Sequence, residues 1–265
     1  MPILARAQAR LYYEVHGAGY PLFLVHGGAG NSLSWYQQVP YFAKRYKVIV
    51  VDLRGFKHSA CQPGHGHPRW FADDLQAVMD AEGHARAAFV CQSLGAWGAL
   101  PLAVRSPGRV ACLYLNGSTT PVYSDENWRV LRIAGEYLSG ERSGPGGPGD
   151  PVGWNRALAA AHPAQRFLAA QVRQLNGPFD ARSMQDDSVK LHAADLAHYR
   201  TPTLVAGGAH DDFLTPTHHL HVAGLIPGAL AQTFDDAGHS AYLETPEAFN
   251  LAVDAFVSRH TGAGA

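Results

Sequence analysis

Short apolar runs that alternate with longer amphipathic stretches constrain the fold of this chain more than any other feature of its sequence. The runs that are apolar almost throughout predict strands buried on both faces of a sheet, and they lie at residues 21–25, 47–52, 87–92 and 109–117. Between them, a stretch such as PRWFADDLQAVMDAEG places Phe71, Leu75 and Val78 on one side of a helix. Strands that alternate with helices predict an α/β fold, in which helices cover both faces of a mostly parallel sheet.

The alternation of strands and helices breaks near Thr119. Residues 121–195 contain helical segments without a clear strand, and they include a stretch at residues 141–153 that is too rich in glycine and proline for a regular element. The strand pattern resumes with TPTLVAGG. We therefore expect a core domain made of residues 1–120 and 196–265, with a helical cap inserted at residues 121–195.

Length, charge and cysteine content exclude several classes of protein. The 265 residues, 46% of them hydrophobic, suffice for one sizeable core. The formal net charge of −1 gives no reason to expect a nucleic acid or an anionic membrane as partner. No run approaches the ~20 apolar residues that cross a bilayer, and the first residues lack the pattern of a secretory signal. Three cysteines make no disulfide framework, so we expect a reducing compartment, the cytoplasm, and we leave monomer and homodimer as alternatives.

Reactive side chains follow three of the predicted strands directly. Ser93 follows AFVCQ, two aspartates follow TLVAGG within a few residues, and His239 follows the last strand. Ligands of open α/β sheets bind outside the carboxyl ends of the strands. A serine hydroxyl needs an imidazole to take its proton, and the imidazole needs a carboxylate to fix its tautomer. The sequence therefore predicts a catalytic triad of Ser93, His239 and an aspartate, either Asp211 or Asp212.

A glycine-rich loop, HGGAG at residues 26–30, follows another buried strand. Such a loop can turn a backbone N–H group toward the serine. We expect the N–H groups of Gly28 and Leu94 to form an oxyanion hole for the charge of a tetrahedral intermediate. Gly95 and Ala96 are small enough for the sharp turn that lifts the serine out of the sheet.

Taken together and in this order, five motifs resemble those of the α/β-hydrolase superfamily. They are the oxyanion loop HGGAG (26–30), the stretch DLRGFKHS (52–59), the nucleophile elbow CQSLGA (91–96), the acid-bearing turn GGAHDDFLTP (207–216) and the histidine loop GHSAYLETPEAF (238–249). The resemblance covers nearly the whole chain and implies an α/β-hydrolase fold with a helical cap. Two residues depart from the pattern, because Lys57 and Cys91 stand where the superfamily has glycine. We expect Cys91 to be a small packing residue.

The resemblance also bears on which aspartate is the triad acid. Counted from Pro202 along the strand, the position of the superfamily's acid is Asp211, whereas counted back from Pro216 it is Asp212. Because a strand fixes position better than the loop that follows it, we expect Asp211, with Asp212 as the alternative.

Other polar and aromatic residues have more ordinary interpretations. The histidines at positions 218, 219 and 221 do not form a tetrahedral ligand set, so we interpret them as surface residues and expect no metal and no organic cofactor. Asp73 and Asp74 are expected on the solvated face of a helix. The candidates for lining a substrate pocket are His26, Gly27, Ala29, Trp128 and Trp154.

The triad and the resemblance together imply a serine hydrolase. Its expected reaction is cleavage of a carboxylic ester or lactone, a small and partly apolar molecule, through an acyl-enzyme. The same fold and triad also fit a carbon–carbon bond hydrolase of the meta-cleavage type or a perhydrolase, and a ligand-sensing or signalling protein with little turnover is a further alternative.

Overall fold

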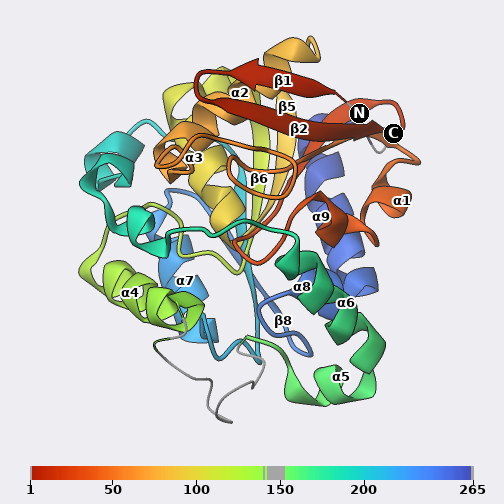
Figure 1. The fold of residues 1–265 in the computed structure, drawn as a ribbon, viewed down its shortest axis with the longest axis vertical. Helices are drawn as coiled ribbons and strands as arrows, with labels where there is room; N and C mark the ends of the chain where they lie inside the picture. The colour runs from red at the N-terminus through yellow and green to blue at the C-terminus, as the bar shows by residue number, and fades with distance from the viewer. Residues whose placement is uncertain (1, 140, 142–152, 264–265) are drawn as a thin grey trace.

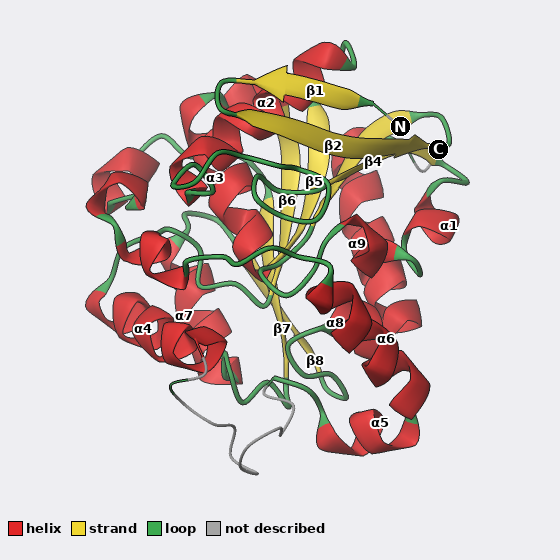
Figure 2. Ribbon diagram, in the orientation of Figure 1, coloured by secondary structure: helices red, strands yellow, loops and turns green. Residues whose placement is uncertain are grey.

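The computed structural model describes residues 2–139, 141 and 153–263. Their centre is an eight-stranded sheet in the order β1-β2-β4-β3-β5-β6-β7-β8. The strands are β1 (Ile3–Arg6), β2 (Ala9–His16), β3 (Tyr20–Val25), β4 (Tyr46–Val51), β5 (Ala87–Gln92), β6 (Val110–Asn116), β7 (Thr203–Gly208) and β8 (Leu230–Phe234). Only the β1–β2 and β2–β4 pairs are antiparallel, and the other pairs are parallel. The mostly parallel sheet expected from the sequence is therefore confirmed, with β1 as an edge strand that was not predicted (Figures 1 and 2).

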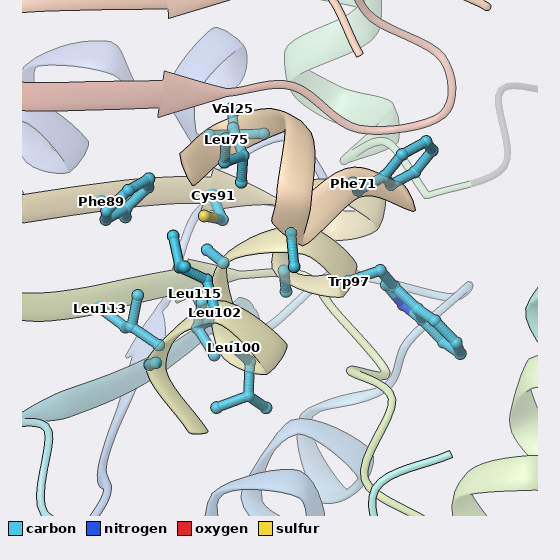
Figure 3. Close-up of a cluster of buried hydrophobic side chains, with 14 of the residues drawn as sticks. Val25, Phe71, Leu75, Phe89, Cys91, Trp97, Leu100, Leu102, Leu113 and Leu115 are labelled. Carbon is cyan, nitrogen blue, oxygen red and sulfur yellow. The ribbon is translucent and has the colours of Figure 1, made fainter. Parts of the chain in front are cut away.

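Helices cover both faces of this sheet. They are α1 (Val39–Phe42), α2 (Phe71–Ala81), α3 (Ala96–Arg105), α4 (Asp125–Ser139), α5 (Arg156–Ala161), α6 (Pro163–Gln174), α7 (Pro216–Leu225), α8 (Ala241–Glu244) and α9 (Pro246–Thr261). Successive strand residues point to opposite faces, so Phe23 packs with Leu75 of α2, while its neighbour Leu24 packs in the other cluster with Val253 of α9. Both strand residues are fully buried. The sheet is thus the middle of three layers, and Figure 3 shows the cluster on the α2–α3 side.

The stretch between β6 and β7 contains α4, α5, α6 and short 3₁₀ helices. Among its described residues the only β-type pairing is a single bridge between Val122 and Leu191. Figure 2 shows α4 and α5 on the side of the molecule opposite β1. We call residues 121–195 the insertion, and its role as a cap stays a prediction. Residues 142–152 of the expected glycine- and proline-rich loop lie outside the described residues. No helix in the described part of the chain is long and apolar enough to cross a membrane.

A buried ion pair joins the exit of β4 to α2. The Arg54 guanidinium donates to both carboxylate oxygens of Asp74, at 2.7 and 2.6 Å, and also to the carbonyl of Ala7 at 3.0 Å. Arg54 and Asp74 are 2% and 3% exposed. The expectation that Asp74 lies on a solvated helix face is therefore wrong, whereas Asp73 does face solvent and pairs with Arg105.

Removing Asp74 should cost far more stability than removing its neighbour. Asp74→Ala leaves a buried guanidinium without its partner, which costs about 3–5 kcal/mol. Asp73→Ala breaks only an exposed ion pair, worth less than ~1 kcal/mol. Urea unfolding followed by circular dichroism measures both, and equal losses for the two variants would contradict the account of the buried pair.

Candidate active site

Ser93 lies at a sharp turn between β5 and α3. Its backbone has φ of +46°, a left-handed conformation that costs a residue other than glycine roughly 1–3 kcal/mol. The turn also brings Gly95 so close to β3 that a Cβ atom there would lie 2.4 Å from the carbonyl oxygen of Val25. Backbone strain of this kind persists only where the surrounding structure enforces it. Here the strained turn places Ser93 at the carboxyl end of β5.

The glycine-rich loop after β3 runs directly over Ser93. A Cβ atom on Gly27 would lie 3.0 Å from the Cβ of Ser93, so the two backbones approach closely. Gly28 is half-buried, and the nearest atom to a Cβ built on it is Cδ2 of Leu94, at 3.9 Å. No described residue accepts a hydrogen bond from the Gly28 N–H. The two predicted oxyanion residues therefore lie side by side next to the serine.

His26 holds this loop from behind. It is fully buried, its Nδ1 lies 2.8 Å from the carbonyl oxygen of Gly27, and its Nε2 accepts a hydrogen bond of 2.9 Å from the N–H of Leu53. Because Nε2 is the acceptor, the proton resides on Nδ1 and is donated to Gly27. Burial lowers the pKa of His26 and keeps the ring neutral. His26 thus faces the protein interior rather than an open pocket, while Ala29 is exposed.

The structure brings His239 together with Asp211 and not with Asp212. Nδ1 of His239 lies 2.8 Å from Oδ2 of Asp211, whose carboxylate is completely buried. The other carboxylate oxygen of Asp211 accepts hydrogen bonds from the N–H groups of Phe213 (2.9 Å) and Leu214 (2.8 Å). Asp212 turns away and accepts a hydrogen bond of 2.6 Å from the N–H of Gly153.

The backbone of His239 is tied to the strand that carries Ser93. Its carbonyl oxygen accepts hydrogen bonds from the side-chain amides of Gln92 (3.0 Å) and Asn116 (3.2 Å). Asn116 also donates to the side-chain oxygen of Gln92 at 2.6 Å, and both amides are buried. The sequence analysis did not single out this pair, although Gln92 and Asn116 are polar residues at the ends of two apolar runs.

Three carboxylates act on the imidazole of His239. Burial by itself lowers the pKa of His239, but the charge and the hydrogen bond of Asp211 raise it, and the charges of Glu244 and Asp212 add to that effect. The net result is a pKa above the ordinary value. With the Nδ1 proton directed at Asp211, Nε2 is the nitrogen left to accept a proton.

An aromatic residue that the sequence did not single out packs on the His239 ring, and the assignment of Trp128 and Trp154 to a substrate pocket stays a prediction. Phe213 packs edge-on against the His239 ring, with 4.9 Å between ring centroids, and Tyr137 of α4 lies 6.0 Å from Phe213. Trp128 packs instead on Trp97 of α3, at 6.1 Å. Trp154 packs against the hydrophobic cluster on the α9 side. The aromatic side chains in contact with the histidine therefore come from the acid-bearing turn and, behind it, from the insertion.

A cavity of about 400 Å³ lies between α4 and residues 179–185. Its lining carries both signs of charge, including Arg132, Glu136 and Arg182. Neither Ser93 nor His239 lines this cavity, so it is separate from the candidate active site. Among the described residues, no three histidine, cysteine or acidic side chains are grouped so that they could hold a metal ion.

Two of the three α7 histidines that were expected at the surface, His218 and His219, are buried, whereas His221 is half-buried. His218 and His219 are 4% and 1% exposed, and neither ring nitrogen of His218 has a hydrogen-bond partner among the described residues. Burial lowers the pKa of His218 to about 4, so its ring is neutral near pH 7. His219 packs beside Gly207 of β7, and its Nε2 lies 3.1 Å from Oγ1 of Thr233 on β8.

Ser93 lies at a strand–turn–helix after β5, and the hydrogen-bonded pair of Asp211 and His239 follows β7 and β8 of the same sheet. This arrangement is typical of the α/β-hydrolase fold. The family model described as the alpha/beta hydrolase fold matches residues 20–246, and the chain belongs to this family.

Similar proteins include several named hydrolases. The chain is 29% identical over 266 residues to a pimeloyl-[acyl-carrier protein] methyl ester esterase of Methylococcus capsulatus, covering 94% of this chain and 98% of the relative. It is 27% identical over 270 residues to a protein of Azorhizobium caulinodans named "Putative carbamate hydrolase RutD", covering 94% and 96%. The solved structure of Est816, described as an N-acyl homoserine lactone degrading enzyme, superposes with a TM-score of 0.76 at 26% identity, covering 96% and 100%. This chain is thus an enzyme of the α/β-hydrolase fold, similar to proteins that act on ester bonds.

Cys91 occupies the first glycine position of the elbow without disturbing it. It is fully buried in the cluster on the α2–α3 side, next to Phe89 on the same strand (Figure 3). Burial also raises the pKa of its thiol, which keeps the sulfur protonated and unreactive. The sulfur is therefore a packing atom, as expected.

The three free thiols should differ in reactivity. In the folded protein a thiol reagent such as DTNB should modify Cys61, which is partly exposed, and spare Cys91 and Cys112, which are buried. All three should react in guanidinium chloride. Rapid modification of Cys91 in the folded protein, detected by peptide mass spectrometry, would contradict the packing role.

Proposed function

We propose that the protein is a serine hydrolase that cleaves a carboxylic ester or lactone through an acyl-enzyme. The single observation that carries the proposal is the 2.8 Å contact between His239, in the loop after β8, and the buried Asp211, in the turn after β7. Ser93 is the nucleophile, because its left-handed turn presents it at the end of β5 on the same edge of the sheet. Asp211 is the triad acid, since Asp212 is bonded elsewhere.

Each residue has one task in the reaction. Nε2 of His239 takes the proton of Ser93 as the hydroxyl attacks the carbonyl carbon, and later delivers that proton to the leaving alkoxide. Asp211 keeps the Nδ1 proton in place and stabilises the imidazolium that forms. Water activated by the same histidine then attacks the acyl-enzyme and releases the acid. The reaction needs no metal or organic cofactor.

The oxyanion is held by the backbone N–H groups of Gly28 and Leu94. The support for this assignment is that the N–H of Gly28 has no acceptor in the described part of the chain and that Gly28 lies beside Leu94. Donors of this kind stabilise the charge that develops on the carbonyl oxygen, and each is typically worth roughly 3–4 kcal/mol in the transition state. His26 supports the loop by fixing the carbonyl of Gly27.

The insertion is proposed as the cap that limits substrate size. Its helix α4 supplies Tyr137, which lies against Phe213 and so close to the histidine. An aromatic wall of this kind favours a partly apolar substrate. The names of similar proteins, a methyl ester esterase and a lactone degrading enzyme, support an ester or lactone as the substrate class.

Substitutions at Ser93 and Asp211 should lower the rate of ester hydrolysis if these residues belong to the proposed triad. On p-nitrophenyl acetate and butyrate, Ser93→Ala should lower kcat/KM by about 10⁴-fold or more. Asp211→Asn should lower kcat/KM by about 10³–10⁴-fold, because an amide no longer holds the imidazole in the tautomer that leaves Nε2 free to accept a proton. If Ser93→Ala hydrolyses these esters as fast as the wild type, the proposed function is wrong, and if only Asp212→Asn collapses the rate, the acid is misassigned.

The pH dependence of kcat/KM should report the raised pKa of His239. The imidazole must be neutral to act as a base, so activity is lost as the pH falls through the pKa of the free enzyme. Because that pKa is raised above 6.5, the acidic half-maximum should lie above pH 6.5. A profile that stays flat down to pH 5 would show that His239 is not the base.

A further inference from the structure

A short segment of the insertion, Gly153–Trp154–Asn155, lies against the loop that carries His239. The N–H of His239 donates a hydrogen bond to the carbonyl of Gly153. A Cβ atom on Gly153 would lie 2.8 Å from the Cβ of His239, and one on Gly238 would lie 2.2 Å from the carbonyl oxygen of Gly153. The two stretches are therefore in contact along their backbones, and Gly153 adopts φ of +82°, which favours glycine.

Two carboxylates hold this segment in place. Asp212 accepts the hydrogen bond of 2.6 Å from the N–H of Gly153. Glu244, which is 6% exposed, accepts a hydrogen bond of 2.7 Å from the N–H of Asn155. Neither carboxylate has a task in the reaction as described above.

Glu244 also binds the backbone on both sides of His239. Its carboxylate accepts hydrogen bonds of 3.0 Å from the N–H groups of both Gly238 and Ser240, the residues on either side of His239. Burial raises the pKa of Glu244, but the three N–H donors favour the ionised form of its carboxyl group, and a protonated form would need an acceptor that these three donors do not provide. One buried side chain thus joins both flanks of His239 to the insertion.

We propose that Asp212 and Glu244 are positioning residues, which hold Gly153–Asn155 against the histidine loop and thereby fix His239 for proton transfer with Ser93. The proposal rests on the proposed function. It makes part of the insertion a component of the catalytic geometry and gives the second aspartate of the acid-bearing turn a task distinct from that of Asp211. The backbone of His239 is then held from two sides, at its N–H by the insertion and at its carbonyl by Gln92 and Asn116.

Substitutions at the two carboxylates test the proposal through kcat and the pH profile. Glu244→Gln keeps the size of the side chain but loses the charge and at least one of its three accepted hydrogen bonds. It should lower kcat by about 10–100-fold with KM for p-nitrophenyl butyrate changed less than about threefold, since a small misplacement of a reacting group can cost about 100-fold in rate. The acidic limb of kcat/KM should move to lower pH, because a negative charge that raises the pKa of His239 is gone.

The pair of variants at position 212 separates hydrogen bonding from charge. Asp212→Ala removes the acceptor for the N–H of Gly153 and should lower kcat by about tenfold or more. Asp212→Asn keeps an oxygen acceptor and should recover most of that loss, whereas a triad acid would not tolerate asparagine. The matched controls are Asp235→Asn and Glu247→Gln, two exposed carboxylates near the same loop, which should behave as the wild type.

The outcomes distinguish this proposal from the proposed function. The positioning role is overturned if Asp212→Ala and Glu244→Gln have the same kcat as the controls. It is also overturned if the pH profile is unchanged and the loss of kcat equals the loss of folded protein measured by thermal unfolding. Ser93→Ala in the same series tests the proposed function separately. An inactive Ser93→Ala together with fully active Asp212→Ala and Glu244→Gln would reject the positioning role alone.

Discussion

The hydrogen bond between His239 and Asp211 is the interaction on which the rest of the site depends. It joins the loop after β8 to the turn after β7, and both strands run parallel to β5, whose carboxyl end carries Ser93. A parallel sheet brings all three strand ends to one edge, where the side chain of Gln92 contacts the backbone of His239, 147 positions further along the chain. The buried carboxylate then raises the pKa of the imidazole against the opposing effect of burial.

The backbone around this interaction is unusually constrained. Ser93 has a left-handed conformation, Gly95 sits where a side chain would collide with Val25, and the His239 loop touches the insertion through Gly153. Buried amides and carboxylates satisfy the polar groups that such close approaches would otherwise leave unpaired. Rigid support of this kind suits catalysis, because the reacting groups must keep their geometry without help from solvent.

Much of this arrangement could be predicted from the sequence, because strands and their terminal residues obey local rules. The buried strands and the places of Ser93 and His239 at strand ends follow from the apolar runs, whereas the preference for Asp211 over Asp212 also needed the resemblance to the α/β-hydrolase superfamily. What failed depends on tertiary contacts. The burial of Asp74 depends on its ion pair with Arg54, twenty positions earlier in the chain, and helical periodicity does not show such a pair. The partners of Gln92 and Glu244 likewise come from distant segments, so no local pattern reveals them.

The central claim is that Ser93 is the residue that attacks the substrate. Incubation of the folded protein with a fluorophosphonate ester, followed by peptide mass spectrometry, tests it most directly, since the reagent leaves a stable adduct on an activated serine. The account predicts one phosphonyl group per chain, located on Ser93, and labelling that is lost in His239→Ala. An adduct on another residue, or ester hydrolysis that survives while Ser93 stays unmodified, would contradict it.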